Sequence, residues 1–589
     1  MNNASLELGG TNWAEKDGNI LGYSVGDTSG KYSPQEFTFA RGSNLSATRI
    51  DRAGLIVKGR ENLALQSNQF DTTWVNINSN ETSGQSGYDG SNDAWILSKS
   101  ASGGFIYQIA NSYSGVYTFS VYAKANASNF IRLNGNAVTD ADAFFNLSTG
   151  LVQSSINCID VKIESVGNGW YRCSITSNDS DLDYINIYPA EAGSISGNSG
   201  SVYIQDAQLE QGLAASPYIE SGATNGTAGV LENTPRLNYT TGVANPYLLL
   251  EPSRTNLLVQ SEYFEASYWT KNDGSLTSGF VSPDGTSNAY KFVEDTSTGT
   301  HNIEKYISSA NGSTNTSTIY AKKGERTHIT LYSGGGFTDS CNFDLENGTS
   351  IDNGTSTSKI ELISNGWYKC SVTAINKSKH VYIMINNGLS GTNGVVYTGD
   401  GTSGVYIFGA MMEEGSYPTS YIPTYSVSAT RAQDVCVKTN ASGEIGQTEG
   451  TMFIESSALS NDYPSDSWYS ISDGTAANRI MIGYYRNPNI IRFYATFQGT
   501  NVLDSTVNVG DISDVKKIVI AYASNDIVAY VNGSNVVTVT NTSSSVPNNL
   551  SKYAFENEGG TYPLYAKVNQ AELYKERLTN AELATLTTI

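Results

Sequence analysis

Residues 168–174 read Asn168-Gly-Trp-Tyr-Arg-Cys-Ser174, and residues 365–371 read Asn365-Gly-Trp-Tyr-Lys-Cys-Ser371. The Asn-Gly pair is a tight-turn signal between two strands. In the first copy, Ile159, Val161 and Ile163 alternate with polar residues just before the turn, as on a half-buried strand. The stretch therefore predicts a β-hairpin that occurs twice in the chain.

The two hairpins belong to a longer duplication over residues 62–425. The offset between matching segments grows only from 194 residues at Asn62 and Asn256 to 203 residues at Val202 and Val405. Further collinear matches are Trp74 with Trp269, 89–94 with 284–289, 121–124 with 319–322, and 145–150 with 343–348. A period this long excludes a solenoid and predicts a duplicated domain.

Residues 427–589 carry strand signals that do not follow the repeat. Runs rich in β-branched and aromatic residues begin at Met452, Ile490, Lys517 and Asp526. Near the end, Thr579 and Glu582 have the spacing of a capping box, which predicts one short helix docked on a sandwich.

The expected fold is all-β, with three β-sandwich modules of the jelly-roll or related kind in series after a short extended N-terminal segment. The predicted parts are 1–61 as an N-terminal attachment segment, 62–221 as repeat 1, 222–255 as a connecting segment, 256–426 as repeat 2, and 427–589 as a third sandwich. Because 61 residues are too few for a robust core, we expect the N-terminal segment to pack on another chain or on a neighbouring domain.

Composition excludes several functional classes. The 589 residues carry a net charge of −21 with only 15% charged residues, so nothing favours binding to nucleic acid or anionic lipid. No apolar run is long enough for membrane insertion, and no secretory signal is visible at the start. Five cysteines without a CxxC motif and only three histidines argue against a disulfide framework, a zinc site and a catalytic triad. We therefore expect no enzymatic activity and no cofactor.

Two resemblances add to this picture. Tyr530-Val-Asn-Gly533 and the closing run 572–583, Glu-Leu-Tyr-Lys-Glu-Arg-Leu-Thr-Asn-Ala-Glu-Leu, are similar to segments of concanavalin A-like (laminin G-like) sandwiches. The resemblance covers about residues 427–589 and implies that fold for the third module. The duplicated modules resemble carbohydrate-binding modules in kind.

The second resemblance is to bacteriophage structural proteins of the tail-fibre and head-fibre type. It rests on the segment 39–56, Phe-Ala-Arg-Gly-Ser-Asn-Leu-Ser-Ala-Thr-Arg-Ile-Asp-Arg-Ala-Gly-Leu-Ile, and on the segment 234–264, which contains Thr-Pro-Arg and Leu-Leu-Leu-Glu-Pro-Ser-Arg-Thr-Asn-Leu. The chain departs from that pattern because repeat 1 separates the two halves.

The phage resemblance implies a virion protein that is assembled in the host cytoplasm. Its expected partners are other virion proteins, further copies of itself, with a trimer as the expected oligomer, and host-surface polysaccharide.

Candidate glycan-binding residues are Trp468, Tyr485 and Tyr494, for which we expect exposed rings. For Tyr494 the reason is that it alternates with the apolar residues of its strand. Outward tyrosines are also common on wet sheets without any binding role. Trp170 and Trp367 occupy the same place in both repeats, which favours anchoring of the core.

Asp179, Asp181 and Asp183 occur at alternate positions and would share one face of a strand. Such a row could bind a structural calcium ion, although a solvated strand edge is the simpler interpretation.

Three functional hypotheses remain. The leading one is a non-enzymatic structural protein of a bacteriophage virion, a fibre or a surface decoration on tail or capsid, which contacts host-surface glycans. The alternatives are a bacterial surface or secreted glycan-binding protein and a polysaccharide depolymerase. The depolymerase would require paired acids in a cleft, and the sequence does not locate them.

Overall fold

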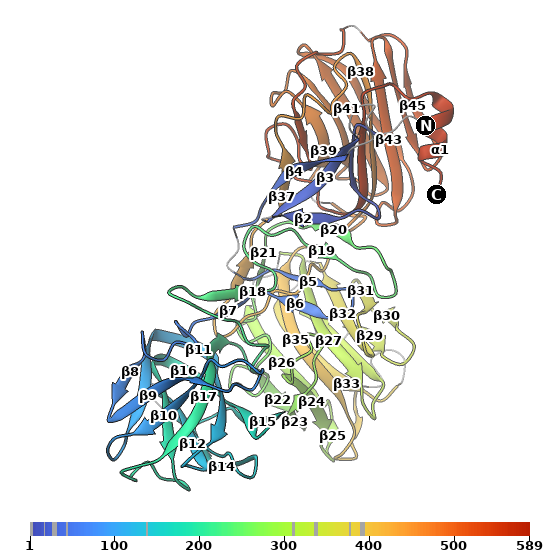
Figure 1. Cartoon of the computed structure of the whole chain (residues 1–589). Coiled ribbons are helices and arrows are strands. Elements are labelled where there is room, and N and C mark those ends of the chain that lie inside the picture. Colours follow the sequence, from blue (N-terminus) through green and yellow to red (C-terminus); the bar gives the residue numbers. More distant parts are fainter. Residues whose placement is uncertain are drawn as a thin grey trace.

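A computed structural model of the chain describes residues 4–16, 18–25, 32–42, 45–136, 140–308, 312–334, 340–375, 378–388, 395–463, 465–542 and 544–589. Over these residues the regular structure consists of strands and one short helix, α1 (Asn580–Leu586), and the all-β prediction is confirmed. Figure 1 shows three strand-rich units, each coloured mainly by one part of the sequence.

The repeat 1 unit is a sandwich in which two long strands run through both sheets. Its strands are β8 (Val75–Ile77), β9 (Ser79–Gln85), β10 (Ala94–Lys99), β11 (Phe105–Ala125), β12 (Phe130–Asn136), β13 (Ala141–Asn146), β14 (Leu151–Ile156), β15 (Asp160–Gly167), β16 (Trp170–Ala190) and β17 (Ser201–Gln211). β11 and β16 are 21 residues each and pair with each other along most of their length. The strand order is β14-β13-β12-β16-β11-β17-β10-β9, with β15 added to β16 and β8 added to β11.

The repeat 2 unit has two separate six-stranded sheets. Its strands are β22 (Thr270–Asn272), β23 (Gly274–Phe280), β24 (Ala289–Glu294), β25 (Thr298–Gly299), β26 (Asn302–Ser308), β27 (Asn315–Lys323), β28 (His328–Ser333), β29 (Ser340–Asp344), β30 (Thr349–Asp352), β31 (Thr357–Leu362), β32 (Trp367–Ala374), β33 (Lys379–Asn386), β34 (Tyr397–Thr398) and β35 (Gly404–Glu414). The sheet orders are β22-β26-β33-β28-β29-β30 and β23-β24-β35-β27-β32-β31.

The two repeats have the same strand order. The halves of β11 correspond to β26 and β27, and the halves of β16 correspond to β32 and β33, so the sheets of one unit map onto those of the other. The predicted Asn-Gly turns are present: Asn168 and Gly169 have φ of 53° and 78°, and Asn365 and Gly366 have φ of 51° and 77°. Two consecutive positive φ values are the geometry that the Asn-Gly pair favours.

One buried asparagine closes each sandwich in the same way. The Asn62 side chain donates to the carbonyls of Ala207 and Ile219 and accepts from the amides of Ala64 and Leu209. In repeat 2, Asn256 makes the same four hydrogen bonds, with the partners Ala410, Ile422, Leu258 and Met412. Both side chains are fully buried, so their hydrogen-bonding groups are satisfied by protein alone.

Trp170 and Trp367 are both buried, as core anchoring predicts. They pack on the outer face of a sheet and not between the two sheets. Trp170 lies against Tyr122 and Ala94, whereas the Trp367 cluster includes Ile56, from the segment that precedes repeat 1.

The C-terminal unit combines three parts of the chain. Its elements are β1 (Leu6–Gly9), β2 (Ala14–Lys16), β3 (Asn19–Val25), β4 (Tyr32–Ala40), β19 (Leu237–Asn238), β20 (Tyr247–Leu250), β37 (Val435–Lys438), β38 (Glu449–Ala458), β39 (Ser467–Ser472), β40 (Arg479–Tyr484), β41 (Ile490–Phe497), β42 (Thr500–Asn508), β43 (Lys516–Ala523), β44 (Asp526–Val531), β45 (Ser534–Val539), β46 (Lys552–Ala554), β47 (Ala566–Tyr574) and α1. β1 and β20 pair with the same edge of β47, and β4 pairs with β3 and with β37.

The predicted boundaries of the C-terminal sandwich therefore need correction. Residues 427–589 do not form it alone, because the main core of the unit also contains Leu6, Leu8, Ile20 and Phe37 from the N-terminal segment. Leu248 and Leu250, from the predicted connecting segment, belong to the same core. The physical reason is that β47 would otherwise present an open edge and an uncovered apolar face. The strands β1 to β4, too few for a core of their own, close both.

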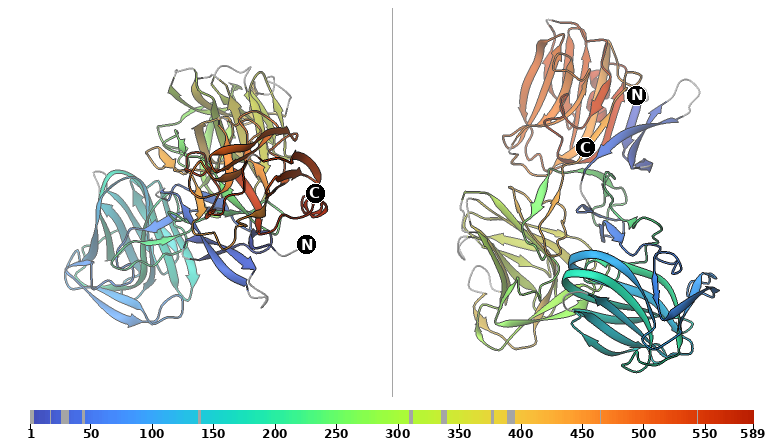
Figure 2. Two further views of the ribbon diagram at one scale, coloured as in Figure 1. Left: turned by 90° about the horizontal axis from the view of Figure 1, so that it is seen from above. Right: turned by 90° about the vertical axis from the view of Figure 1, so that its left-hand side faces the viewer.

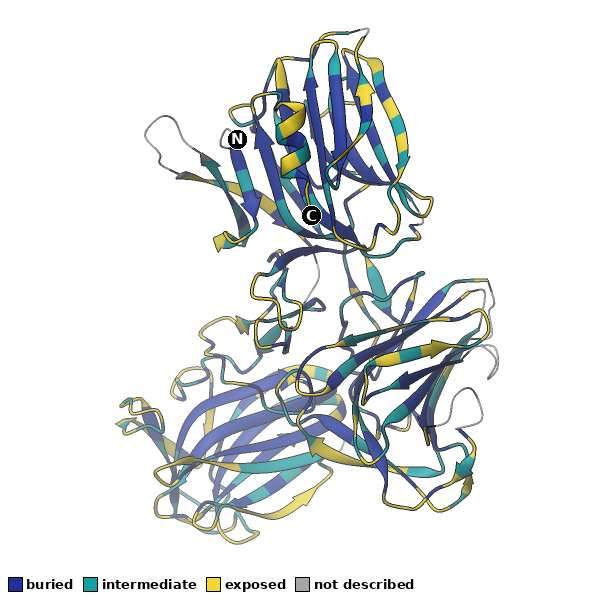
Figure 3. Ribbon diagram, turned by 90° about the vertical axis from the view of Figure 1, so that its right-hand side faces the viewer, coloured by how far each residue is buried: buried dark blue, intermediate teal, exposed yellow. Residues whose placement is uncertain are grey.

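Both ends of the described chain lie on this unit. β1 and α1 are on the same body in all three views, although more than 500 residues separate them in sequence (Figures 1 and 2). α1 begins with the predicted capping box: Glu582 accepts from the backbone of Thr579, and Thr579 accepts from the backbone of Glu582. Figure 3 shows the helix on the outside of a sheet, mostly exposed, with Leu583 as its buried contact.

Short strands join the units. They are β5 (Thr48–Ile50), β6 (Ile56–Lys58), β7 (Arg60–Asn62), β18 (Gly226–Ala228), β21 (Arg254–Asn256) and β36 (Ala429–Arg431). They pair as β5 with β6, β7 with β18 and β21 with β36, so that the chain enters and leaves each repeat through a two-stranded neck.

The N-terminal strands are expected to stabilise the distant β47. Leu8 is fully buried, and a Leu8→Ala substitution should cost about 2–5 kcal/mol through lost contacts and a residual cavity. We expect faster hydrogen–deuterium exchange of residues 566–574 in this variant. Leu151→Ala is the matched control, because Leu151 is 64% exposed on β14. Unchanged exchange in β47 of the Leu8→Ala variant would contradict the assignment of β1 to this core.

Candidate functional site

The predicted aromatic residues lie close together on the outer face of the sheet β39-β40-β41. The Arg492 guanidinium stands 5.7 Å from the ring centroid of Trp468, 5.4 Å from that of Tyr485 and 5.5 Å from that of Tyr494. Arg492 is held by Asp466 at 3.0 Å and by Asp504 at 2.8 Å. The three rings thus surround one cation, a favourable geometry for cation–π contacts.

The expectation of exposed rings is wrong for Trp468, which is only 5% exposed. Its ring lies over Gly483, where even a Cβ atom would come within 2.4 Å of it, and Arg492 covers part of its surface. Tyr485 and Tyr494 remain half-buried, and guanidinium groups lie over them as well. Glycan binding by these residues stays a prediction. Strand alternation in the sequence predicts that Arg492 and Tyr494 share one face. It does not predict that Asp466 and Asp504 pair with Arg492.

The three aspartates do not converge on one point. Asp179 is buried and accepts a hydrogen bond from Ser177, whereas Asp183 is half-buried and accepts one from Ser112 at 2.8 Å. Burial raises the pKa of Asp179. Within the described residues, no group of three or more His, Cys, Asp and Glu side chains is arranged to hold a metal ion.

The strongest charge cluster lies at the junction between repeat 2 and the C-terminal unit. We call Arg41, Arg236, Glu251, Arg431 and Asp434 the junction ion cluster. Arg41 Nη1 lies 3.2 Å from Asp434 Oδ1, and Arg236 Nη1 lies 2.6 Å from Glu251 Oε2. Arg431 Nη1 lies 3.1 Å from the same Glu251 oxygen, and Arg236 also pairs with Asp434. The side chains of all five residues are at most 4% exposed.

The cluster ties together segments that are remote in sequence. Arg41 follows β4, Glu251 follows β20, and Asp434 lies between β36 and β37. Backbone groups add further hydrogen bonds: Arg41 donates to the carbonyls of Leu231 and Thr234, and Asp434 accepts from the amide of Glu251. These partners matter because buried charges without partners cost several kcal/mol each.

Glu251 and Arg41 of the cluster are both ionised at neutral pH. Burial alone would raise the pKa of Glu251, but the guanidinium groups of Arg431 and Arg236 outweigh it and hold that pKa well below its ordinary range. Burial lowers the pKa of Arg41 to about 10, which still leaves it protonated at neutral pH.

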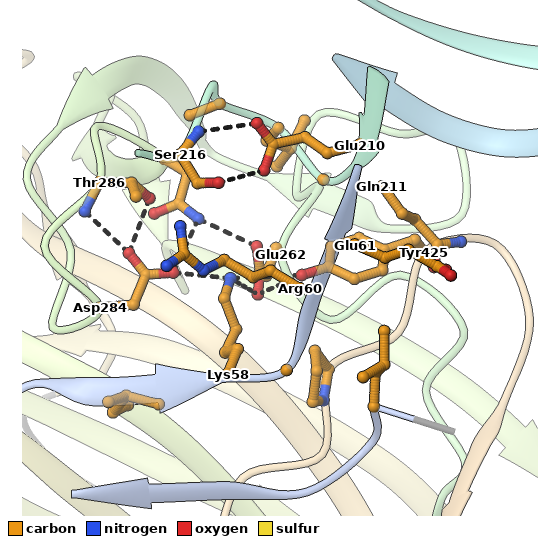
Figure 4. A pocket seen from close by; sticks show the side chains of 18 of the residues that line it. Lys58, Arg60, Glu61, Glu210, Gln211, Ser216, Glu262, Asp284, Thr286 and Tyr425 are labelled. Atoms are coloured by element: carbon orange, nitrogen blue, oxygen red, sulfur yellow. Dashed lines mark hydrogen bonds and ion pairs between the residues drawn. The ribbon is translucent and has the colours of Figure 1, made fainter. Parts of the chain in front are cut away.

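A second junction, between the two repeats, contains a cavity of about 560 Å³. Its walls come from residues 45–63, from repeat 1 and from repeat 2. Figure 4 shows Lys58 pointing from its strand toward Glu262 and Asp284, with Arg60, Glu61 and Tyr425 nearby. We call this cavity the junction pocket.

Lys58 is the centre of the inner wall of the pocket. Its Nζ lies 2.9 Å from Glu262 Oε1 and 2.6 Å from Asp284 Oδ2. Burial opposes ionisation of Lys58, but the carboxylates of Asp284 and Glu262 raise its pKa well above the ordinary value. Burial likewise opposes ionisation of Asp284, and Lys58 nevertheless lowers its pKa to about 2. Lys58 and Asp284 are therefore an ion pair at neutral pH, whereas burial and the charge of Asp284 raise the pKa of Glu262. We call these three side chains the ion triad.

Sequence reasoning missed both junction sites. Asp284 was visible only as a match to Asp89 in repeat 1, and both accept from the residue two positions on, as in an Asx turn. Only in repeat 2 does this aspartate face a lysine. Lys58, a cation in the apolar run Leu55-Ile56-Val57-Lys58, was the one signal available from sequence.

No helix of the described residues is long and apolar enough to cross a membrane.

No protein-family model and no curated protein matches the chain. Among solved structures, it is similar to the CBM40 module of a Ruminococcus gnavus IT-sialidase bound to α2,3-sialyllactose, with 13% identity, a TM-score of 0.21, and coverage of 24% of this chain and 84% of that one. It is also similar to a tandem of CBM22 modules from Paenibacillus barcinonensis, with 10% identity, a TM-score of 0.20, and coverage of 64% and 99%. A Trypanosoma rangeli sialidase matches at 10% identity and a TM-score of 0.22, over 98% of both chains. Similarity at this level assigns neither a family nor an activity to this chain.

Removing one acid from the junction ion cluster should destabilise the junction strongly. Asp434→Ala leaves Arg41 without its carboxylate partner and Arg236 with Glu251 alone, and breaking a buried ion pair in this way typically costs about 3–5 kcal/mol. Hydrogen–deuterium exchange of residues 230–256 should accelerate accordingly. Asp504→Ala is the control, because this partly exposed carboxylate pairs with Arg492 at the surface and should matter by about 1 kcal/mol or less. Equal effects of the two variants would contradict a structural role of the cluster.

The junction should also weaken in acid. The folded-state pKa of Glu251 lies below the unfolded value of about 4.3, so its contribution is complete at neutral pH and is lost as the pH falls below about 4.3 toward the folded pKa. Denaturant unfolding between pH 7 and pH 3 should show this loss. The Glu251→Gln variant, although less stable at pH 7, should show a smaller decrease. Parallel curves for the two proteins would be the contrary result.

Proposed function

We propose that the chain is a non-enzymatic structural protein of a bacteriophage virion, a fibre or a surface decoration on the tail or capsid. One observation carries the proposal. The segments that resemble phage fibre proteins, 39–56 and 234–264, supply Arg41, Arg236 and Glu251 to the junction ion cluster. Residues 43 and 44 of the first segment lie outside the described residues. The resemblance therefore includes residues whose part in this chain is to join two units.

The buried contacts at the junction support a structural role. The five buried charged side chains of the junction ion cluster lie where three segments of the chain pass between the C-terminal unit and repeat 2, and β4 and β20, which precede Arg41 and Glu251, belong to the sheets of that unit. Domain pairs that move freely have small polar interfaces, and enzymes that close around substrates rely on such freedom. Here the contacts are buried and continuous with a sandwich core, which suits a spacer that must keep its shape.

The partners of this role are other virion proteins and further copies of the chain, for which a trimer is proposed. Host-surface polysaccharide is the proposed external partner, and weak single contacts would gain strength from many copies.

Immunogold electron microscopy tests the virion role. An antibody against the purified chain should label intact phage particles, at the tail or on the capsid, when particles are prepared from the bacterium that carries the gene. A preimmune serum and particles from a strain with the gene deleted are the controls. Label confined to the cell envelope, with none on particles, would replace this proposal by a bacterial surface protein.

A further inference from the structure

The junction pocket has the size and composition of a small-molecule site. Its volume of about 560 Å³ lies within the range of roughly 300–1,000 Å³ in which proteins commonly bind small ligands. The wall combines apolar side chains, including Leu55 and Leu213, with the tyrosines 113, 117 and 425. We propose that this pocket binds a neutral sugar residue, such as the end of an uncharged glycan.

Charge excludes the two ionic classes of ligand. Lys58 is already paired with both Glu262 and Asp284, so its positive charge is compensated within the protein and is not free to bind an anion. The carboxylates are also saturated. Glu262 accepts from Lys58, Tyr421, Tyr425 and Asn288, which leaves no open oxygen for a cationic ligand.

Asp284 is saturated in the same way. One of its oxygens accepts from the Ser282 hydroxyl and from both the amide and the hydroxyl of Thr286, while the other faces Lys58. A metal or an ammonium group would have to displace these contacts. The ion triad is therefore a rigid floor of the pocket, and the ligand has to be uncharged.

The remaining groups suit a polyhydroxylated ring. Tyr113 and Tyr117 stack with their centroids 5.4 Å apart and their planes within 24°. Tyr117 is only 7% exposed, so the half-buried ring of Tyr113 is the accessible part of this aromatic pair. Sugar rings present aliphatic C–H groups on their faces and hydroxyls at their edges. Arg60, Glu61 and Gln211 line the same cavity and are exposed or half-buried, so they offer both donors and acceptors to those hydroxyls.

A bound sugar would also stabilise the junction between the two repeats. The walls come from the segment 45–63 and from both repeats, so one bound sugar contacts three parts of the chain at once. A ligand that binds only the assembled junction stabilises it by mass action. Sugar binding should therefore raise the melting temperature of the repeats, whether or not the protein belongs to a virion.

Glycan-array binding by the full-length protein tests the inference. The probes are neutral glycans that end in glucose, galactose, mannose or N-acetylglucosamine, with sialylated glycans on the same array. We expect binding to at least one neutral terminus, with little change between about 50 and 500 mM salt because no long-range attraction is involved. The free monosaccharide should raise the melting temperature. The absence of any bound neutral glycan, or binding to sialylated glycans alone, would overturn the proposal.

Two pocket variants and one control variant test whether the sugar binds in the junction pocket. Tyr113→Ala should weaken it at least fivefold, and Gln211→Ala, at an exposed position of low structural cost, should weaken it at least twofold. Tyr184→Ala is the control, because Tyr184 is a tyrosine of repeat 1 that is more exposed than Tyr113, at 36%, and does not line the pocket. Loss of binding in the control with retention in the other two variants would assign the sugar to another surface. These outcomes do not depend on the immunogold result, so the two proposals fail separately.

Discussion

The arrangement of this chain depends on the pairing of buried charged side chains in the junction ion cluster. Arg41, Arg236 and Arg431 are fully buried beside Glu251 and Asp434, and the loss of one partner from such a buried pair typically costs about 3–5 kcal/mol. The five residues come from three segments of the sequence. Pairing the three guanidinium groups with the two carboxylates requires all three segments to meet at one place, and that place sets the join between repeat 2 and the C-terminal unit.

The C-terminal unit depends on this join. Arg41 directly follows β4. β4 pairs with β37 on one side and with β3 on the other, and β3 pairs with β1. β1 and β20 then cover consecutive stretches of β47. An edge that would otherwise invite pairing with another chain is used within the molecule. The same principle recurs between the repeats, where Lys58 is neutralised by two carboxylates of repeat 2 and brings the segment 45–63 against both sandwiches.

Predictions from sequence succeeded where the signal was local. The Asn-Gly turns and the capping box at Thr579 depend on residues close in sequence, and the structure has both. The collinear repeat is read by comparing the chain with itself, and the two repeats have the same strand order. The strand before the first turn is present as β15, but burial does not alternate along its first half, and Ile159 packs against the repeat 2 core while Val161 and Ile163 pack against the repeat 1 core. The same reasoning placed Arg492 and Tyr494 on one strand face. It did not show that Trp468 is buried, because that depends on the close approach of its ring to Gly483 on the next strand.

By itself, the amino-acid sequence determined that this is an all-β chain with a duplicated sandwich and a third strand-rich part. Period-two alternation and turn residues are properties of neighbouring residues, and the duplication can be read by comparing the chain with itself. Only the tertiary structure decided that Leu6 and Leu8 belong to the core of a unit most of whose residues follow more than 400 positions later. Only the tertiary structure brought Arg41 to Asp434 and Lys58 to Asp284. Such pairings depend on which apolar faces and buried charges remain unsatisfied after the local elements have formed, and this is a property of the whole assembled chain.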